Sequence, residues 1–106
     1  MTCKVASFGI GQVIHHRTFN YRGVIFDVDP DFQGSEEWYE KNWGSDHSNR
    51  NEPWYHVLID QDGRVAYVAE RNLEVEPLVE PVEHPLIDNF FAGFTGDAYT
   101  PRQTLN

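Results

Sequence analysis

The chain has 106 residues, of which 17 are acidic and 8 are basic, giving a formal net charge of −9. This length suits a single folding unit that buries about two thirds of the surface of its unfolded chain, and the negative charge disfavours a protein that binds nucleic acid mainly through phosphates. A lone cysteine, Cys3, excludes an internal disulfide and suits the cytoplasm, and neither a targeting segment nor an apolar run of about 20 residues that would span a membrane is recognisable.

Two strands joined by a turn are predicted at the N-terminal end. Residues 11–18 alternate between apolar and polar side chains, and residues 22–29 are rich in β-branched and aromatic types. Asn20, between them, suits a left-handed turn position. The sequence therefore predicts a first β-hairpin.

This hairpin carries the only cluster of basic side chains in the sequence, "HHRTFNYR" at residues 15–22. His15, Arg17 and Arg22 are therefore the candidates for contacts with DNA phosphates. The alternative is that they are exposed strand and turn residues, which the negative net charge favours.

Three aspartates alternate with apolar residues at the end of the second strand, in "FDVDPDF" at residues 26–32. Asp27, Asp29 and Asp31 would share one face of an extended chain and could hold a cation there. A helix-loop-helix calcium site also needs glycine at its sixth position and glutamate at its twelfth, and this chain has neither. We therefore favour a structural role, in which the acids line the exit of the strand and Pro30 ends its pairing.

A short helix is predicted over residues 35–43, "SEEWYEKNW". Ser35 can cap its first turn, and Glu36 and Glu37 favour its amino-terminal end. The residues that follow, "GSDHSNRNE" at 44–52, have a turn-forming composition and no periodicity. We predict that they form a polar, mobile loop.

A second hairpin follows, in which residues 54–60 and 64–69 are joined by a turn at Asp62 and Gly63. A last short strand is predicted at residues 73–76. Short strands of this kind with one small helix indicate a mainly β fold, either a small barrel or a twisted sheet.

From Pro77 onward the composition changes, because four of the six prolines and a group of aromatic residues lie there. We therefore divide the chain into a β domain, residues 1–76, and an irregular C-terminal segment, residues 77–106. The segment either wraps around the β domain or serves as a docking tail. The candidate partner-binding residues of such a tail are Phe90, Phe91, Phe94 and Tyr99.

No arrangement typical of an enzyme or a metal site is recognisable. His15 and His16 are adjacent, so on a strand they face opposite ways and could not bind one ion together. His47, His56 and His84 lack metal-ligand spacing, and we interpret each histidine as solvated. Neither a nucleophile motif nor a phosphate-binding loop is present. We therefore predict a protein with no catalytic residue, no metal and no cofactor.

Four segments between Phe8 and Leu73 carry a family resemblance: "FGIGQVIHH", "YRGVIFDVDPDF", "PWYHVLID" and "YVAERNL". In order and spacing they resemble the HspQ family of heat-shock proteins, also called the YccV-like or hemimethylated-DNA-binding domain. The resemblance implies a small SH3-like β-barrel without a cofactor or catalytic activity. It also implies a small homo-oligomer, with a trimer as the expected form.

The resemblance also assigns a set of motif residues, most of which have structural explanations. Gly23, for example, lets the chain leave the first turn. The sequence departs from the family pattern at Asn20, where glycine is common. The C-terminal segment does not align with the family pattern. The matching residues are Gly11, Gln12, Tyr21, Arg22, Gly23, Asp27, Asp29, Pro30, Trp54, Tyr55 and Tyr67.

Two functions follow from the resemblance. One is a partnership with the Lon protease, in which the protein enhances the degradation of chosen protease substrates and can itself be degraded. The other is binding of hemimethylated DNA. The chain has few basic residues for phosphate contacts, so its charge favours the Lon partnership, with DNA binding as the alternative. A structural subunit and a small-molecule pocket among the aromatic residues are further alternatives.

Overall fold

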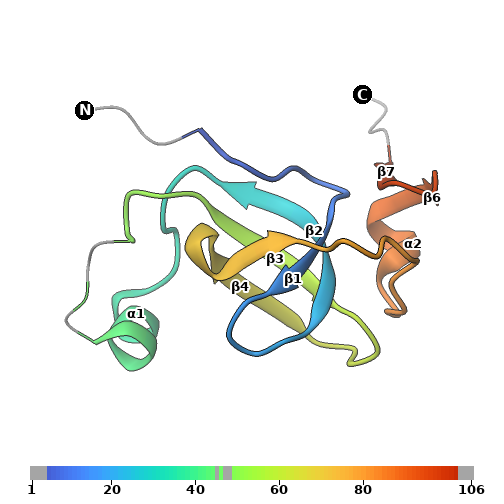
Figure 1. The fold of residues 1–106 in the computed structure, drawn as a ribbon. Coiled ribbons are helices and arrows are strands. Elements are labelled where there is room, and N and C mark those ends of the chain that lie inside the picture. The colour runs from blue at the N-terminus through green and yellow to red at the C-terminus, as the bar shows by residue number, and fades with distance from the viewer. Residues whose placement is uncertain (1–4, 45, 47–48, 103–106) are drawn as a thin grey trace.

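The structure, a computed structural model, describes residues 5–44, 46 and 49–102. In chain order its elements are β1 (Val13–His16), β2 (Arg22–Asp29), α1 (Glu36–Trp43), β3 (Trp54–Ile59), β4 (Val65–Ala69), the 3-10 turn η1 (Glu70–Asn72), β5 (Leu73–Val75), α2 (Ile87–Phe90), β6 (Phe91–Phe94) and β7 (Tyr99–Pro101). All five predicted strands are present, and their bounds differ from the prediction by at most two residues at either end. The mainly β class is confirmed (Figure 1).

The first five strands form one antiparallel sheet in the order β4-β3-β2-β1-β5. Strands β1 and β2 connect through a turn in which Asn20 has a φ of 59°, the left-handed conformation expected for it. Strands β3 and β4 connect through a turn with positive φ at Gln61 and Gly63. The chain then passes through η1 to the other edge, where β5 pairs with β1. No ladder joins the edges β4 and β5 among the described residues, so the SH3-like barrel stays a prediction.

Helix α1 begins where the sequence predicts it. The Ser35 hydroxyl accepts a hydrogen bond from the backbone N–H of Trp38 (3.1 Å), and Gly44, with a φ of 60°, follows the last turn. A helix of 8 residues is not stable alone, so its fully buried Tyr39 must hold it through packing. Within the described ranges, no helix is long and apolar enough to cross a membrane.

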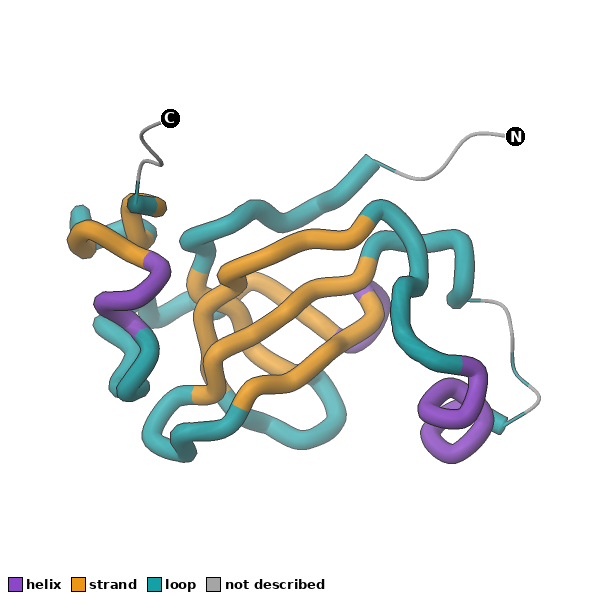
Figure 2. The backbone as a smooth tube through the Cα atoms, turned by 180° about the vertical axis from the view of Figure 1, so that it is seen from behind, coloured by secondary structure: helices purple, strands orange, loops and turns teal. Residues whose placement is uncertain are grey.

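Alternation along β3 separates the two faces of the sheet. Tyr55 and Val57 point to one face, where they form a cluster with Ile14, Ile25, Val68 and Leu73. Trp54 and Leu58 point to the other face, whose two ends are covered by different parts of the chain. Trp54 packs under α1, and Leu58 packs under the C-terminal segment. Figures 1 and 2 show these two coverings at opposite ends of the sheet.

The C-terminal segment, predicted to be irregular, contains α2 and a hairpin of β6 and β7. The prediction was wrong because Gly96, with a φ of 100°, and a hydrogen bond from the Thr95 N–H to the Ala98 carbonyl (2.9 Å) build a tight turn. Phe91 and Tyr99 are 1% and 6% exposed, in one cluster with residues of β1, β2 and β3. The segment therefore wraps the sheet. This core cluster contains residues from both sides of position 76, the predicted boundary between the β domain and the C-terminal segment. That boundary stays a prediction.

The described part of the segment after α1 is anchored, which corrects the expectation of a mobile loop. Asn49 is fully buried, and its backbone carbonyl accepts a hydrogen bond from the indole N–H of Trp54 (2.9 Å). Glu52 is 4% exposed and accepts hydrogen bonds from the Arg71 guanidinium (2.5 and 2.9 Å). These contacts, which composition does not reveal, hold the described residues of the segment in place. His47 lies outside the described residues.

Candidate functional site

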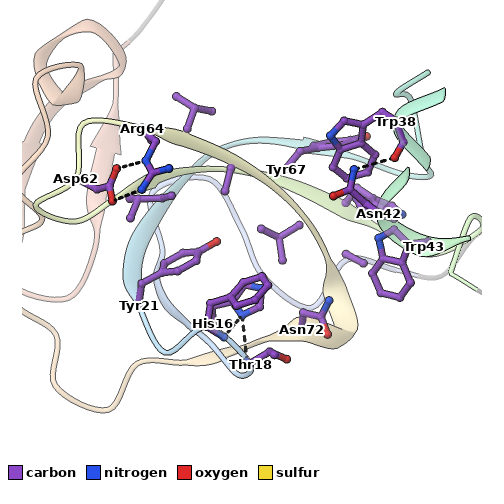
Figure 3. Close-up of a pocket in the computed structure, with 17 residues that line it drawn as sticks. His16, Thr18, Tyr21, Trp38, Asn42, Trp43, Asp62, Arg64, Tyr67 and Asn72 are labelled. Carbon is purple, nitrogen blue, oxygen red and sulfur yellow. Dashed lines mark hydrogen bonds and ion pairs between the residues drawn. The ribbon is translucent and has the colours of Figure 1, made fainter. Parts of the chain in front are cut away.

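A groove of about 990 Å³ runs along the free edge of β4. Residues of β4 line it together with the β1–β2 hairpin on one side and helix α1 on the other (Figure 3). Both sides contribute aromatic rings, Phe19 and Tyr21 from the hairpin and Trp38 and Trp43 from the helix. The sequence left open a pocket among the aromatic residues but did not locate it, because these rings are far apart along the chain.

The hairpin wall of the groove is built around His16. Its ring contacts the rings of Phe19 and Tyr21, at centroid distances of 4.7 and 5.0 Å. His16 Nδ1 accepts hydrogen bonds from the backbone N–H groups of Thr18 (3.1 Å) and Phe19 (3.0 Å). Burial lowers the pKa of His16 and raises the pKa of Tyr21 to about 12. The interpretation of every histidine as solvated is wrong here, since His16 is 3% exposed.

Tyr67 of β4 organises the opposite wall. Its ring contacts Trp38 and Trp54, at centroid distances of 5.9 and 5.0 Å. Its hydroxyl donates a hydrogen bond to Asp29 (2.7 Å) and accepts one from the backbone N–H of Gln33 (3.0 Å). Burial, followed by the bond to Asp29, raises the pKa of Tyr67, so the hydroxyl keeps its proton at neutral pH. The wall is therefore held by polar contacts as well as by ring packing.

The backbone of β4 offers free hydrogen-bonding groups to the groove. Backbone bonds from Ile59 N–H to Arg64 C=O (3.1 Å) and from Glu70 N–H to Pro53 C=O (3.0 Å) fix which residues face β3. By the alternation of an antiparallel pair, the N–H and C=O groups of Ala66 and Val68 also face β3. Those of Val65 and Tyr67 face away, and no described residue hydrogen-bonds them. Ala69 also faces away from β3, but it is 1% exposed and its carbonyl begins the η1 turn, so it offers no free group.

A cluster of potential metal ligands lies on the sheet face between α1 and the C-terminal segment. Ligand atoms of Asp27, Asp29 and His56 all lie within 4.8 Å of one another. Asp31, which the sequence placed with the other two, hydrogen-bonds Gln33 instead. Asp29 is already engaged by His56 Nε2 (3.0 Å) and by a tyrosine hydroxyl, and Asp27 accepts a bond from a backbone N–H. We therefore assign Asp29 and His56 a role in tying β2 to β3 and β4.

A comparison with protein-family models matches residues 6–98 to the model described as hemimethylated DNA-binding protein YccV like. The chain belongs to the YccV-like family. This match confirms the resemblance and extends it beyond Leu73 into the C-terminal segment. The family is one of binding domains.

Similar curated proteins are much longer than this YccV-like chain. F-box only protein 21 of Mus musculus is 33% identical over 99 residues, and that of Homo sapiens is 32% identical over the same length. In both comparisons the match covers 92% of this chain and 16% of the relative. The chain thus spans less than a fifth of the length of these relatives.

Several of the predicted YccV-like motif residues lie where the sheet packs closely, and their structural role stays a prediction. A Cβ on Gly23 would lie 2.5 Å from Val57 Cγ1 and 2.6 Å from a backbone oxygen, so β2 and β3 meet there only because the side chain is absent. The Gln12 side chain accepts a hydrogen bond from the Gly9 N–H (3.1 Å). Tyr55 is fully buried and donates to a carboxylate (2.6 Å), whereas Pro30 is exposed after β2. Trp54, also fully buried, belongs to the cluster under α1.

The candidate DNA-binding residues are engaged within the protein. His15 lies between Asn20 Oδ1 (2.6 Å) and a glutamate of β5 (2.8 Å). Arg17 donates from Nε to the backbone carbonyl of Leu73 (3.2 Å). Arg22 donates to an aspartate carboxylate (2.8 Å) and to a backbone carbonyl (2.6 Å). The structure thus places these residues near one another on and beside β1 and β2, each with at least one polar atom bound within the protein.

The other arginines are engaged as well. Each of the remaining four donates to a side-chain carboxylate or a backbone carbonyl, in the pairs Arg50 with Glu36 (2.7 Å), Arg64 with Asp62 (2.5 Å), Arg71 with Glu52 (2.5 Å) and Arg102 with the Asp88 carbonyl (2.5 Å). A phosphate would therefore compete with these partners for the guanidinium groups.

His15 and His16 should titrate on opposite sides of the ordinary histidine pKa of about 6.5. The hydrogen bond to Asn20, and then Glu74, raises the pKa of His15, whereas burial lowers that of His16. The His15 contacts therefore stabilise the fold fully at pH values below the unfolded pKa, and this stability is lost as the pH rises through the folded pKa. The stability contributed by His16 has the opposite pH dependence. It is fully present above the unfolded pKa of His16 and is lost as the pH falls through its folded pKa.

Ring-proton resonances followed by NMR across the neutral range would measure both values, with His15→Asn used to assign the resonances. The same variant should lose more stability, relative to the parent chain, in acid than in alkali. A His16 that titrates above His15 would contradict the arrangement.

Proposed function

We propose that this YccV-like chain is a non-catalytic protein-quality-control factor that binds polypeptide and modulates the degradation of substrates by the Lon protease. The observation that carries the proposal is the groove, which joins exposed and half-buried aromatic rings to an unpaired strand edge. Aromatic rings and free backbone groups are what a protein surface uses to recognise another polypeptide. No step of this function requires a cofactor.

The charges support a polypeptide partner over a nucleic acid. The chain carries a net charge of −9, and its arginines are bound to internal partners. Long-range attraction therefore favours cationic segments over phosphates. The relatives support a module that works beside other domains, since the matching region is only 16% of F-box only protein 21.

A degradation assay with purified Lon tests the proposal. A panel of candidate substrates would be incubated with Lon and ATP, with and without the chain, and the chain would also be offered alone. We expect an ATP-dependent change in rate for some substrates and a smaller change with Phe19→Ala, which removes an exposed ring from the groove. Val75→Ala, which shortens a 60% exposed apolar side chain outside the groove, is the matched control. Unchanged rates across the panel would contradict the proposal.

The second candidate function is binding of hemimethylated DNA, favoured by the description of the family. We expect weak binding without methylation specificity, since 8 bases oppose 17 acids in the chain. Fluorescence anisotropy with hemimethylated and unmethylated duplexes at about 150 mM salt would measure it. A submicromolar, methylation-dependent affinity would reverse our preference, and Arg17→Ala and Arg22→Ala would then locate the contact.

Three expectations from the family accompany the proposal. They are an SH3-like closure of the sheet, a small homo-oligomer of three chains and a location in the cytoplasm. Sedimentation equilibrium over a range of concentrations would report the number of chains. The docking role of Phe90, Phe91, Phe94 and Tyr99 also stays a prediction, although the structure exposes Phe90, half-buries Phe94 and buries Phe91 and Tyr99.

A further inference from the structure

We infer that the free edge of β4 accepts an extended, cationic polypeptide segment as an added strand. This inference rests on the proposed function, because it names the site and the chemistry through which a partner polypeptide would bind. The groove defined above is that site.

The backbone of β4 sets the conformation of the ligand. Val65 and Tyr67 turn their N–H and C=O groups into the groove, two residues apart. An extended peptide presents its own donors and acceptors with the same spacing, so it can pair with both residues. A helical segment has satisfied its own backbone groups and could not do so.

The walls of the groove determine which side chains of a bound peptide would be favoured. Side chains of an added strand would alternate between the two faces of the sheet. Those on one face would meet the hairpin wall, where Phe19 is 74% exposed, and those on the other would meet Trp38 and Tyr67. Val65, 49% exposed on β4 itself, adds a further apolar contact. Apolar or aromatic residues are therefore favoured at several positions of the ligand.

The charge of the protein favours a cationic peptide over other extended apolar peptides. The acidic and basic groups that line the groove, Asp62 and Arg64, form an ion pair and cancel each other (Figure 3). The field at the groove is then set by the rest of the chain, whose net charge is −9. Lysine or arginine between the apolar residues of the ligand would be attracted, and glutamate would be repelled.

Two fluorescein-labelled peptides test the inference with the full chain. One has the sequence Lys-Phe-Thr-Val-Lys-Phe-Thr-Val-Lys, and the other has glutamate in place of every lysine. We expect the cationic peptide to bind more tightly, measured by anisotropy. Amide hydrogen exchange at Val65 and Tyr67 should slow when it binds, because these N–H groups gain acceptors.

Val65→Pro is the decisive variant, because proline removes an outward N–H group while the bonds of Ala66 and Val68 to β3 remain. Loss of that hydrogen bond should weaken peptide binding about fivefold. Val65→Thr keeps the N–H group and a similar shape, so it should bind like the parent chain. The melting temperature of each variant would show that it is folded.

Several results would overturn the inference. They are binding of neither peptide, equal binding by Val65→Pro and the parent chain, or slowed exchange elsewhere on the surface only. Exchange at β4 that slows with protein concentration alone would assign the edge to a second copy of the chain instead. If strand addition fails while Lon rates still change, only this inference falls. If strand addition holds while Lon rates do not change, the proposed function falls.

Discussion

Replacing Phe91 with alanine should lower the free energy of unfolding by about 3 to 5 kcal/mol. Phe91 is 1% exposed and packs against Tyr99, with ring centroids 5.2 Å apart, in the cluster that contains Val13, Val24 and Leu58. Truncation would leave a cavity between the sheet and the C-terminal segment. A small domain has only a little more stability than this change removes, so much of the variant should be unfolded at physiological temperature.

Urea denaturation followed by tryptophan fluorescence would measure the change. Phe90→Ala is the matched control, because its neighbouring ring is 36% exposed and should contribute much less. Deletion of residues 85–106 extends the test, and we expect it to abolish cooperative unfolding. A truncated chain that melts at the parental temperature would show that the segment is not part of the core. Loss of the Lon response in such a folded truncation would support the docking tail.

Replacing Gly11 with alanine should lower the free energy of unfolding by about 2 to 5 kcal/mol. Gly11 has a φ of 93°, which an L side chain rarely adopts, and a Cβ added there would lie 2.1 Å from the backbone oxygen of Tyr99. That oxygen belongs to a strand and cannot move aside like the tip of a flexible side chain. The N–H of Tyr99 also donates to the Gly11 carbonyl (2.8 Å), so a shift would break this bond.

Gly9→Ala is the control for this experiment, because nothing lies within 4 Å of a Cβ at that position. It should leave the unfolding midpoint almost unchanged. Thermal unfolding monitored by circular dichroism would compare the two variants. Equal stability of both would show that the contact between Gly11 and β7 does not form as described.

The strands and turns of the main sheet were predictable because their causes are local. Alternating and β-branched runs give the strands, Asn20 and Gly63 give the turns, and Ser35 gives the helix cap. The hairpin of β6 and β7 escaped prediction, because the prolines around it suggested irregular chain. Its cause is the Gly96 turn together with apolar contacts to β1, β2 and β3, which are distant in the sequence and which no local pattern reports.

The groove could not be predicted from the sequence, for the same physical reason. Tyr67 and Asp29 are 38 residues apart, and His16 meets its partners only because the hairpin folds back. The sequence singled out Asp29 and Tyr67 as family motif residues without showing that they touch. An exposed Phe19 beside the turn was the one available signal, since a large apolar side chain at a polar turn is unusual.

The contact between Gly11 and Tyr99 has a consequence for biosynthesis. Because β7 closes the core that β1 begins, Val13, Val24 and Leu58 stay uncovered until residue 99 has emerged from the ribosome. The nascent chain therefore completes this domain only after nearly all of it has been translated, and it exposes apolar strand surface in the meantime. Where such a domain is built into a longer polypeptide, the inserted stretch has to run at least from Gly11 to Tyr99, since any shorter graft would omit one half of the closing contact.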